Sequence, residues 1–419
     1  MENQIKLIGP FKQLLTMDHL PEKGAILDAQ LEIIDAAAIC ISNGKIIDIG
    51  HFQALQDKWA NQAQMIVLEA DYVALPGYID CHTHIAFGGN RAQDFAMRNA
   101  GQSYLAIAAA GGGIWSTVAH TRACHQAELR DLTIMRSRDL MKQGITTIEV
   151  KSGYGLSILE ELKILRSIKE ANEACEVDLI STCLAAHMKP KDFDGSAEAY
   201  LQEIAEELFP VLIAEKLTHR MDVFIEESAF TAEEAKGYLL RAKDLGFDIS
   251  IHADQFTNAG SALAVELKAV SADHLEASKT TEINRIADSD VVAVALPAAS
   301  LGLGCAFTPA RQLLDAGACL AIASDWNPGS APMGRLMEGA SILASMEKLS
   351  NAEVLSALTN RAAKALRLAD RGKLKVGLIA DFMLYKTANY QNITYLQGGL
   401  QPEQVWKNGQ LIYTNKTKS

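Results

Sequence analysis

Eight short apolar segments that alternate with helical stretches constrain the fold of this 419-residue chain more than any other feature. The expected strands span residues 78–82, 146–150, 177–185, 222–225, 248–252, 269–273, 291–296 and 319–324. The clearest helical stretches carry apolar residues at helical spacing, at 129–142, 160–171, 232–245 and 258–267. Buried strands that alternate with helices predict an α/β fold with a parallel sheet. Eight of them favour a distorted (β/α)₈ TIM barrel, with a doubly wound sheet as the alternative.

The two ends of the chain show a different pattern, of short strands and tight turns. Strand-like runs at 37–41 and 45–49 flank Asn43-Gly44, and runs at 404–407 and 410–413 flank Asn408-Gly409. Asn-Gly between two strands is a strong hairpin signal. Neither end has enough apolar residues for a core of its own. We therefore expect residues 1–75 and 372–419 to form one small composite β-sandwich domain, and residues 76–371 to form the catalytic barrel.

Charge and cysteine content narrow the classes of function. The formal net charge is −12 and the isoelectric point is about 5.4, which argues against nucleic acid or an anionic membrane as a partner. No apolar run reaches transmembrane length, and the polar start lacks a signal-peptide layout. The seven cysteines form no CxxC pair, which indicates a reduced, cytoplasmic protein. The sequence leaves the oligomeric state open, a homodimer included.

A pair of histidines, His82 and His84, ends the first strand of the expected barrel. Side chains two residues apart on a strand point to the same side, so the two imidazoles face one way. Pro76-Gly77 before the strand and Gly88-Gly89 after it mark a strand that runs into a loop. Two imidazoles on one face form half of a metal site, with two unrelated surface histidines as the alternative.

Polar residues also end other strands of the expected barrel. They are His187 after the third strand, residues 252–255 after the fifth, Asp273 and His274 after the sixth, and Asp325 after the eighth. In a barrel all these strand ends lie on one face, where active sites form. One such histidine alone would most simply be a hydrogen-bonded structural residue. The convergence of six polar residues on one apolar rim favours a catalytic site.

Four of these residues, His82, His84, His252 and Asp325, offer three nitrogens and one carboxylate oxygen. That donor set suits one Zn²⁺ or Fe ion per chain and is too rich in nitrogen for Mg²⁺ or Ca²⁺. A metal ion held in this way lowers the pKa of a bound water toward neutrality. We expect Asp325 to take the proton of that water, and His274 to orient the water or stabilise the developing oxyanion.

A run of three glycines at 111–113 lies in a long insertion, residues 88–127, between the first two strands. The run lacks the Lys-Ser/Thr of a phosphate-binding loop. Barrels tolerate such insertions, because their catalytic loops grow at the carboxyl ends of the strands. We interpret the glycines as a flexible part of a loop that covers the site, with a plain linker as the alternative.

Taken together, these motifs resemble the amidohydrolase superfamily, and within it the enzymes of histidine degradation that open an imidazolone ring. The superfamily pattern is the HxH of the first strand, the histidines after the fifth and sixth strands and the aspartate after the eighth. The narrower resemblance depends on HIAFGGNR at 84–91, KSGYG at 151–155, AAH at 185–187, HADQF at 252–256, SADHL at 271–275 and DWNPG at 325–329. It extends from about residue 40 to the C-terminus.

The resemblance implies a metal-dependent hydrolase that converts the cyclic amide of 4-imidazolone-5-propanoate into N-formimidoyl-L-glutamate. Its expected catalytic residues are Asp325, His274 and Gln255. By position, it places the substrate against Arg91, Tyr154, His187 and Gln255, with Asn327, Gly329 and Ser330 nearby. An arginine fork pairs with a carboxylate, such as the propionate tail, through two hydrogen bonds.

Other functions stay open on the sequence alone. Another cyclic amidohydrolase or an aminohydrolase would share the metal ligands, although Gln255 cannot titrate like the proton-shuttling glutamate of deaminases. Glu226, after the fourth strand, could bridge a second metal ion. A non-catalytic protein on the same fold is a remote alternative, because such relatives typically lose metal ligands and this chain keeps all four.

Overall fold

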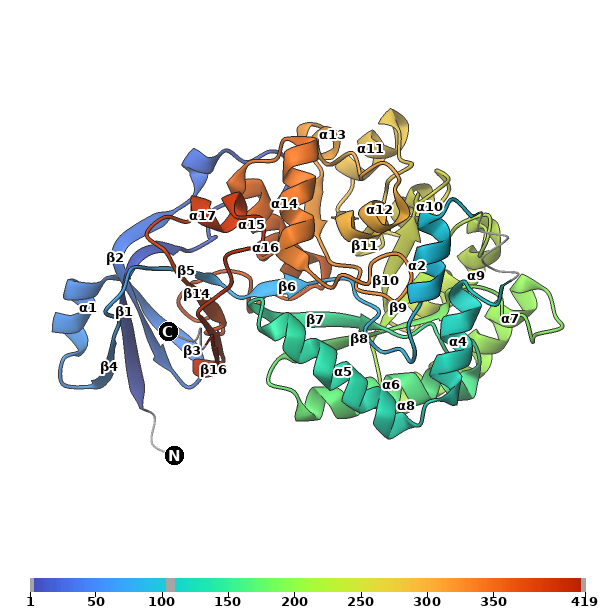
Figure 1. Cartoon of the computed structure of the whole chain (residues 1–419), viewed down its shortest axis with the longest axis horizontal. Coiled ribbons are helices and arrows are strands. Elements are labelled where there is room, and N and C mark those ends of the chain that lie inside the picture. The colour runs from blue at the N-terminus through green and yellow to red at the C-terminus, as the bar shows by residue number, and fades with distance from the viewer. Residues whose placement is uncertain (1–3, 103–109, 416–419) are drawn as a thin grey trace.

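The computed structural model describes residues 4–102 and 110–415, which form two parts, each built on one eight-stranded sheet (Figure 1). The first sheet lies on the left of Figure 1 and contains segments from both ends of the chain, and the second forms the barrel on the right. The strands of the barrel are β6 (Tyr78–Asp80), β7 (Ile145–Lys151), β8 (Asp178–Ala186), β9 (Arg220–Phe224), β10 (Asp248–Ala253), β11 (Ser271–His274), β12 (Val292–Ala295) and β13 (Cys319–Ile322).

The barrel strands pair in parallel and in chain order, from β6 to β13. All eight expected strands are present, and the prediction of a (β/α)₈ barrel is confirmed. A doubly wound sheet would require the strand order to reverse, so that alternative is wrong. The first strand is shorter than expected, because its ladder ends at Asp80 and His82 lies beyond it.

Hydrogen bonds at the carboxyl rim join the two edges of this sheet. The Asp325 backbone N–H donates to His82 O at 3.0 Å, and the His84 N–H donates to Trp326 O at 3.0 Å. The Asp80 carboxylate accepts the backbone N–H of Ser324 at 2.9 Å and its hydroxyl at 2.5 Å. The histidine pair after β6 and the aspartate after β13 are therefore held side by side.

Helices surround the barrel (Figure 1). The clearest predicted stretches correspond to α5 (Gln126–Met141), α6 (Ile158–Ala174), α9 (Ala232–Asp244) and α10 (Gly260–Glu266). The remaining helices of this part are α7 (Ala197–Glu203), α8 (Phe209–Glu215), α11 (Thr280–Ala287), α12 (Pro297–Leu303), α13 (Ala310–Asp315), α14 (Leu336–Glu347), α15 (Asn351–Ala357) and α16 (Asn360–Ala365). The insertion after β6 contributes α2 (Ala92–Asn99) and α4 (Ile114–Ala123), which pack over the carboxyl side of the strands in Figure 1.

The terminal sheet joins the start and the end of the chain. Its strands are β1 (Ile5–Leu15), β2 (Ile33–Ser42), β3 (Lys45–His51), β4 (Ala63–Val67), β5 (Tyr72–Pro76), β14 (Phe382–Lys386), β15 (Gln404–Lys407) and β16 (Gln410–Thr414). β5 pairs antiparallel with β14, so both ends share one sheet, as expected. Asn43 and Gly44 have φ of 50° and 75°, and Asn408 and Gly409 have φ of 50° and 68°. These values are those of the tight hairpin turn that Asn-Gly predicts.

Buried charges attach the terminal sheet to the barrel. The Lys407 ammonium of β15 donates to Asp381 at 2.5 Å and to Asp178, the first residue of β8, at 2.7 Å. The sheet therefore packs near the amino ends of the barrel strands, away from the rim that carries the histidines. The division at residues 75/76 and 371/372 into two domains stays a prediction.

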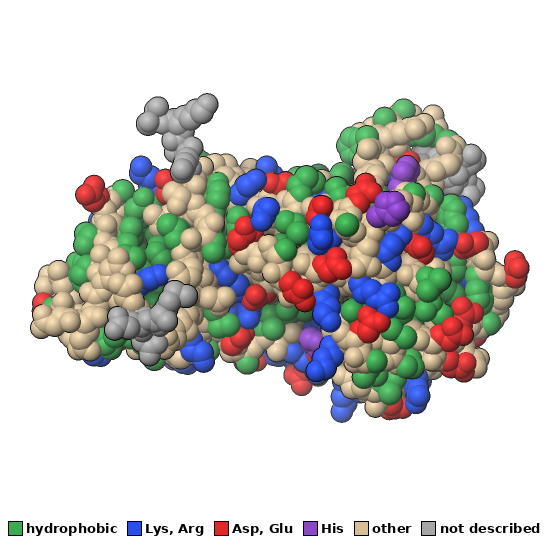
Figure 2. Space-filling model, turned by 90° about the horizontal axis from the view of Figure 1, so that it is seen from below, with side chains coloured by type: hydrophobic (Ala, Val, Ile, Leu, Met, Phe, Trp, Pro, Cys, Tyr) green, Lys and Arg blue, Asp and Glu red, His purple; other side chains and the backbone are tan. Residues whose placement is uncertain are grey.

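The surface carries both signs of charge. Figure 2 shows acidic and basic side chains interspersed over the barrel half of one face, whereas apolar and uncharged atoms dominate the end with the terminal sheet. Within residues 4–102 and 110–415, no helix combines the length and the apolar character needed to cross a membrane.

Candidate active site

Three histidines converge at the carboxyl end of the barrel. His82 Nε2 lies 3.2 Å from His84 Nε2, which in turn lies 3.3 Å from His252 Nε2. Asp325 Oδ1 is 3.6 Å from His82 Nε2 and 3.4 Å from His84 Nε2. The His82–His84 alternation places both imidazoles on one side, although both residues lie beyond the β6 ladder.

These separations match a metal site. Ligand atoms about 2.0–2.1 Å from a tetrahedral Zn²⁺ lie about 3.3–3.4 Å from one another. Asp325 Oδ1 is buried and has no hydrogen-bond partner among the described residues. Burial lowers the pKa of His82 and His84 well below the ordinary value and that of His252 to about 4. The imidazoles are therefore neutral at pH 7, in the form that binds metals, and His82, His84 and His252 could hold a metal ion.

Two buried carboxylates orient the histidines from behind. His82 Nδ1 donates to Asp273 Oδ2 at 2.6 Å. His252 Nδ1 lies 3.0 Å from Asp222 Oδ2, a close contact without the alignment of a hydrogen bond. A carboxylate on Nδ1 leaves the lone pair on Nε2, which fixes the ring orientation that a metal ligand needs.

The Lys151 ammonium lies behind these carboxylates, fully buried. Its Nζ lies 2.8 Å from Glu149, 2.8 Å from Asp222 and 3.8 Å from Asp273. Burial opposes the charge of Asp222, but the nearby His252 and Lys151 hold the pKa of this carboxyl well below its usual range. Lys151 therefore compensates the negative charges of the carboxylates behind His82 and His252.

His274 and Asp325 face the cavity from strained backbone. Their φ angles are 86° and 49°, a left-handed region that residues with side chains rarely adopt. Burial lowers the pKa of His274, but Glu276, whose Oε2 lies 3.5 Å from Nδ1, outweighs it and raises this pKa. Burial raises the pKa of Asp325 to about 6. A histidine and a carboxylate whose pKa values are both raised thus flank the three histidines that could hold a metal ion.

A cavity of about 480 Å³ opens above the histidines, at the carboxyl ends of the strands. It is bordered by His84, His252, His274 and Asp325. All seven residues of the expected substrate set also line it, namely Arg91, Tyr154, His187, Gln255, Asn327, Gly329 and Ser330. The structure thus brings these residues together with the candidate metal ligands, and their roles stay predictions.

Arg91 lines this cavity and is held by neighbouring residues. Its Nε donates to Asp94 Oδ2 at 2.7 Å, and the same oxygen accepts the Gly113 N–H at 2.8 Å. Gly113, the last of the three glycines, therefore tethers the insertion to this corner. A Cβ at Gly329 would collide with the Arg91 guanidinium, so this close approach requires glycine. Asn327 holds Gly329 by accepting its N–H at 2.8 Å.

The KSGYG segment wraps around the buried carboxylate of Glu161. That carboxylate accepts the N–H groups of Gly153 at 3.0 Å, Gly155 at 2.7 Å and Leu156 at 2.8 Å. Gly153 has φ of 106°, a conformation that favours glycine, and its carbonyl lies 3.0 Å from His187 Nδ1. The segment thereby fixes the ring orientation of His187, and burial lowers the pKa of this histidine to about 4.

The loop after β10 places Gln255 at the cavity. Asp254 Oδ1 accepts the N–H groups that begin α10, from Gly260 at 2.9 Å and Ser261 at 3.0 Å, so Asp254 has a structural role. Glu226 Oε2 accepts the backbone N–H of Phe256 at 2.9 Å. Glu226 therefore holds the loop that carries Gln255 and does not join the histidine cluster as a second metal site would require.

Several residues of this site were not predicted from the sequence. The carboxylates of Asp222 and Glu161, the lysine Lys151 and the second cavity arginine Arg98 had no assigned role, and Asp273 was noted only for its position. Asp273 and Lys151 lie inside the resembling motifs, and that position was the one available signal. Asp222 and Arg98 contact residues far away in the sequence, so no local pattern marks them. Glu161 bonds a loop only five to eight residues before it, but that loop had no predicted conformation.

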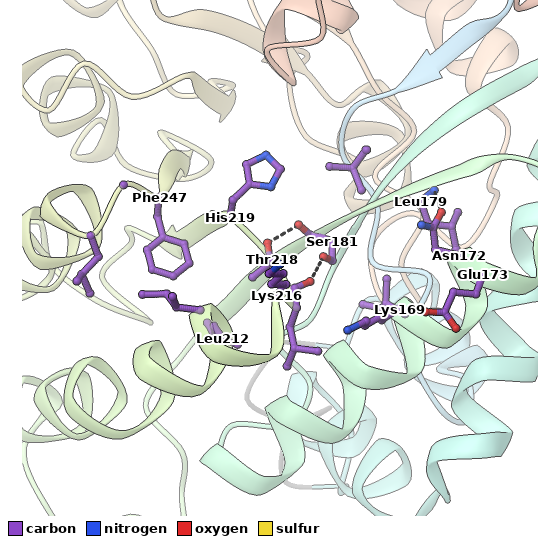
Figure 3. Close-up of a pocket in the computed structure, with 16 residues that line it drawn as sticks. Lys169, Asn172, Glu173, Leu179, Ser181, Leu212, Lys216, Thr218, His219 and Phe247 are labelled. Carbon is purple, nitrogen blue, oxygen red and sulfur yellow. Dashed lines mark hydrogen bonds between the residues drawn. The ribbon is translucent and has the colours of Figure 1, made fainter. Parts of the chain in front are cut away.

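A second cavity, of about 530 Å³, lies at the opposite end of the barrel (Figure 3). It is bordered by the start of β8, the segments before β9 and β10, and the helices α6 and α8. Its hydroxyl groups have protein partners, because Ser181 donates to Leu217 O at 2.5 Å and Thr218 donates to Ser181 O at 2.6 Å. Figure 3 shows Phe247 and Leu212 on one side of Ser181 and Thr218, and Leu179, Asn172, Glu173 and Lys169 on the other.

Comparisons with known proteins agree with this geometry. A model of the amidohydrolase family matches residues 117–413. The chain is 38% identical to an imidazolonepropionase of Bdellovibrio bacteriovorus, with 97% of this chain and 96% of that protein covered. It is 41% identical to an imidazolonepropionase of Rubrobacter xylanophilus, with 91% and 92% covered.

Solved structures share the fold at lower identity. An atrazine chlorohydrolase from Arthrobacter aurescens superposes with a TM-score of 0.68, at 17% identity and with 98% of this chain and 95% of that chain covered. An adenosine deaminase from Xanthomonas campestris superposes with a TM-score of 0.65, at 17% identity and with 98% and 93% covered. At this identity the two structures support the fold alone.

Proposed function

This chain belongs to the amidohydrolase family, and we propose that it is a hydrolase that opens the ring of 4-imidazolone-5-propanoate to give N-formimidoyl-L-glutamate. The observation that carries the proposal is that one cavity is lined both by Arg91 and by residues of the histidine cluster. The substrate has a carboxylate for the first and a ring amide for the second. Relatives at 38% and 41% identity that are named imidazolonepropionase support the same assignment.

His82, His84, His252 and Asp325 are the proposed ligands of one Zn²⁺ or Fe ion per chain. When bound, that ion lowers the pKa of a water molecule toward neutrality and polarises the ring carbonyl. The neutral imidazoles and the unpartnered Asp325 Oδ1 are the features that favour it. Elemental analysis of the purified protein should give one metal ion per chain.

Asp325 is the proposed base and acid of the reaction. It accepts a proton from water as the water oxygen bonds to the ring carbonyl carbon. The carbonyl oxygen gains negative charge, and His274, whose protonated form is favoured by Glu276, donates a hydrogen bond to it. The ring C–N bond then breaks, and Asp325 returns its proton to the departing nitrogen. The carbonyl carbon becomes a carboxylate, and ammonia is not released.

Four residues are proposed to hold the substrate in place. Arg91 pairs with the propionate carboxylate, and Tyr154, His187 and Gln255 contact the ring. Burial keeps Tyr154 in its neutral form because it raises the phenol pKa, and the low pKa of His187 keeps that imidazole neutral. Neutral donors and acceptors suit an uncharged ring. Gln255 cannot shuttle protons, which disfavours a deaminase.

Ultraviolet-monitored turnover tests the proposal. We expect wild-type enzyme to consume imidazolone propionate, to form N-formimidoyl-L-glutamate stoichiometrically and to leave hydantoins, other lactams and aminopurines unchanged. Stoichiometric ammonia from an aminopurine, without opening of imidazolone propionate, would instead identify an aminohydrolase. All seven cysteines are free, which accords with the reducing cytoplasm that we propose as its location.

A further inference from the structure

A second arginine, Arg98, lines the same cavity as Arg91, and both lie beside Gly329 at one corner of it. It lies on the last turn of α2, seven residues after Arg91. Its Nε is buried and has no hydrogen-bond partner among the described residues. One Nη donates to Gly329 O at 3.4 Å, at the weak limit for such a bond. The Arg98 guanidinium also lies 5.7 Å from the centroid of the Phe95 ring, but its Nε is left free, whereas Arg91 Nε is bound to Asp94.

The described residues do not balance the charge at this corner. Two guanidinium groups face one carboxylate, Asp94, whose Oδ2 already serves Arg91 Nε and the Gly113 N–H. Burial and the neighbouring Arg91 both lower the pKa of Arg98, and its guanidinium still stays charged at neutral pH. A partly buried cation without a partner costs free energy unless an anion compensates it. The corner lacks one negative charge.

We propose that Arg98 is a second carboxylate-binding residue, which pairs with Arg91 to select substrates that carry an anionic tail. This inference extends the proposed function, since it assigns the tail to two guanidinium groups. Asp94 holds the Arg91 side chain in place, and the Arg91 guanidinium lies against Gly329. Arg98 supplies the free Nε, so the substrate carboxylate completes the charge balance of the corner. A neutral tail would leave Arg98 unpaired and would be rejected.

The test compares an acid with its amide. Binding of 3-(imidazol-4-yl)propionate and of its carboxamide is measured by calorimetry on the metal-loaded wild type, Arg98→Met and Arg98→Lys. Turnover of imidazolone propionate is measured on the same proteins. We expect Arg98→Met to weaken binding of the acid roughly 10- to 100-fold, the size of one lost charge-assisted hydrogen bond. Binding of the amide should change less than about twofold by the same reasoning.

Two controls separate recognition from structure. Arg98→Lys keeps the charge without the planar fork, so it should recover part of the preference for the acid. Arg130→Met, at a partly exposed arginine of α5, should change the binding of neither ligand. In turnover, Arg98→Met should raise KM far more than it lowers kcat. Thermal unfolding verifies that each variant is folded.

The outcomes decide between three cases. Equal weakening of acid and amide, or no change in either, overturns the assignment of Arg98. Loss of the preference for the acid together with wild-type inactivity toward imidazolone propionate would overturn the proposed function but keep Arg98 as a carboxylate-binding residue. If Arg98→Met does not fold, Arg98→Lys provides the test. A preference for the acid over the amide equal to that of the wild type would then count against the proposal.

Discussion

The two ends of the barrel hold cavities of similar size that differ in whether their buried polar groups have partners. At the carboxyl rim, about 480 Å³ is bordered by four imidazoles, Asp325 and two arginines, several of whose polar atoms have no described partner. At the amino end, about 530 Å³ is bordered by apolar side chains, by hydroxyls bonded to backbone, and by Lys169, Asn172, Glu173, Lys216 and His219 (Figure 3). None of these described side chains has a buried polar atom without a partner. Cavity size therefore does not distinguish a site, whereas uncompensated polar groups do.

The difference has a physical cause. Buried polar groups without partners and left-handed backbone at His274 and Asp325 both cost stability. Such costs persist in a folded protein when a ligand offsets them or when the reaction needs them. The lining residues described at the amino end have no such unpartnered buried groups, so we interpret that cavity as a packing gap. The predictions below test this contrast, in order of decreasing effect on turnover.

Asp325→Asn should reduce kcat about 10³-fold or more, because the rim loses its proton acceptor and a metal-ligand oxygen together. Steady-state turnover of imidazolone propionate measures the loss, and elemental analysis reports how much metal remains. Near-normal turnover of a folded variant would mean that Asp325 is not the base and that the catalytic role assigned to the carboxyl rim is wrong.

Arg91→Met should lower kcat/KM about 10²-fold for imidazolone propionate, since a buried carboxylate loses a bidentate partner. The methionine keeps most of the length of the side chain and the packing on Gly329. The same change should scarcely affect an analogue with a neutral tail. If both substrates suffered alike, Arg91 would be shaping the loop and not binding the tail.

Asp273→Asn should weaken metal affinity roughly 10- to 100-fold, because His82 Nδ1 loses the charged acceptor at 2.6 Å. Competition with a chelator, followed by metal analysis, gives the affinity directly. Asp131→Asn, at an exposed residue of α5, is the matched control. Unchanged metal retention in Asp273→Asn would show that the carboxylate behind His82 is dispensable.

Leu212→Ala, in the wall of the amino-end cavity, should leave kcat/KM unchanged and destabilise the fold by about 2–5 kcal/mol. Leu212 is fully buried, so the change enlarges a cavity without touching the rim. Denaturant unfolding measures the stability, and turnover at low temperature measures the kinetics. A kinetic defect in a folded variant would break the contrast, because the amino end would then communicate with the site.

Periodic local patterns were sufficient to predict the architecture. Apolar runs of strand length located all eight barrel strands, and Asn-Gly located both hairpins of the terminal sheet. β1 and β5 were missed, because Lys12 and Gln13 interrupt the first and a fully buried strand such as the second shows no alternation. The expected metal and substrate residues line one cavity, since a parallel barrel brings every carboxyl strand end to one face.

The residues that support the site were decided only by the tertiary structure. His82 and Asp273 are 191 positions apart, and Lys151 contacts carboxylates from three strands. Spacing along one element determines which way a side chain points, and the sequence carries that information locally. Which groups it then meets depends on the register of strands distant in the chain, and so does whether a charge such as Arg98 is compensated. Those properties exist only once the barrel has closed.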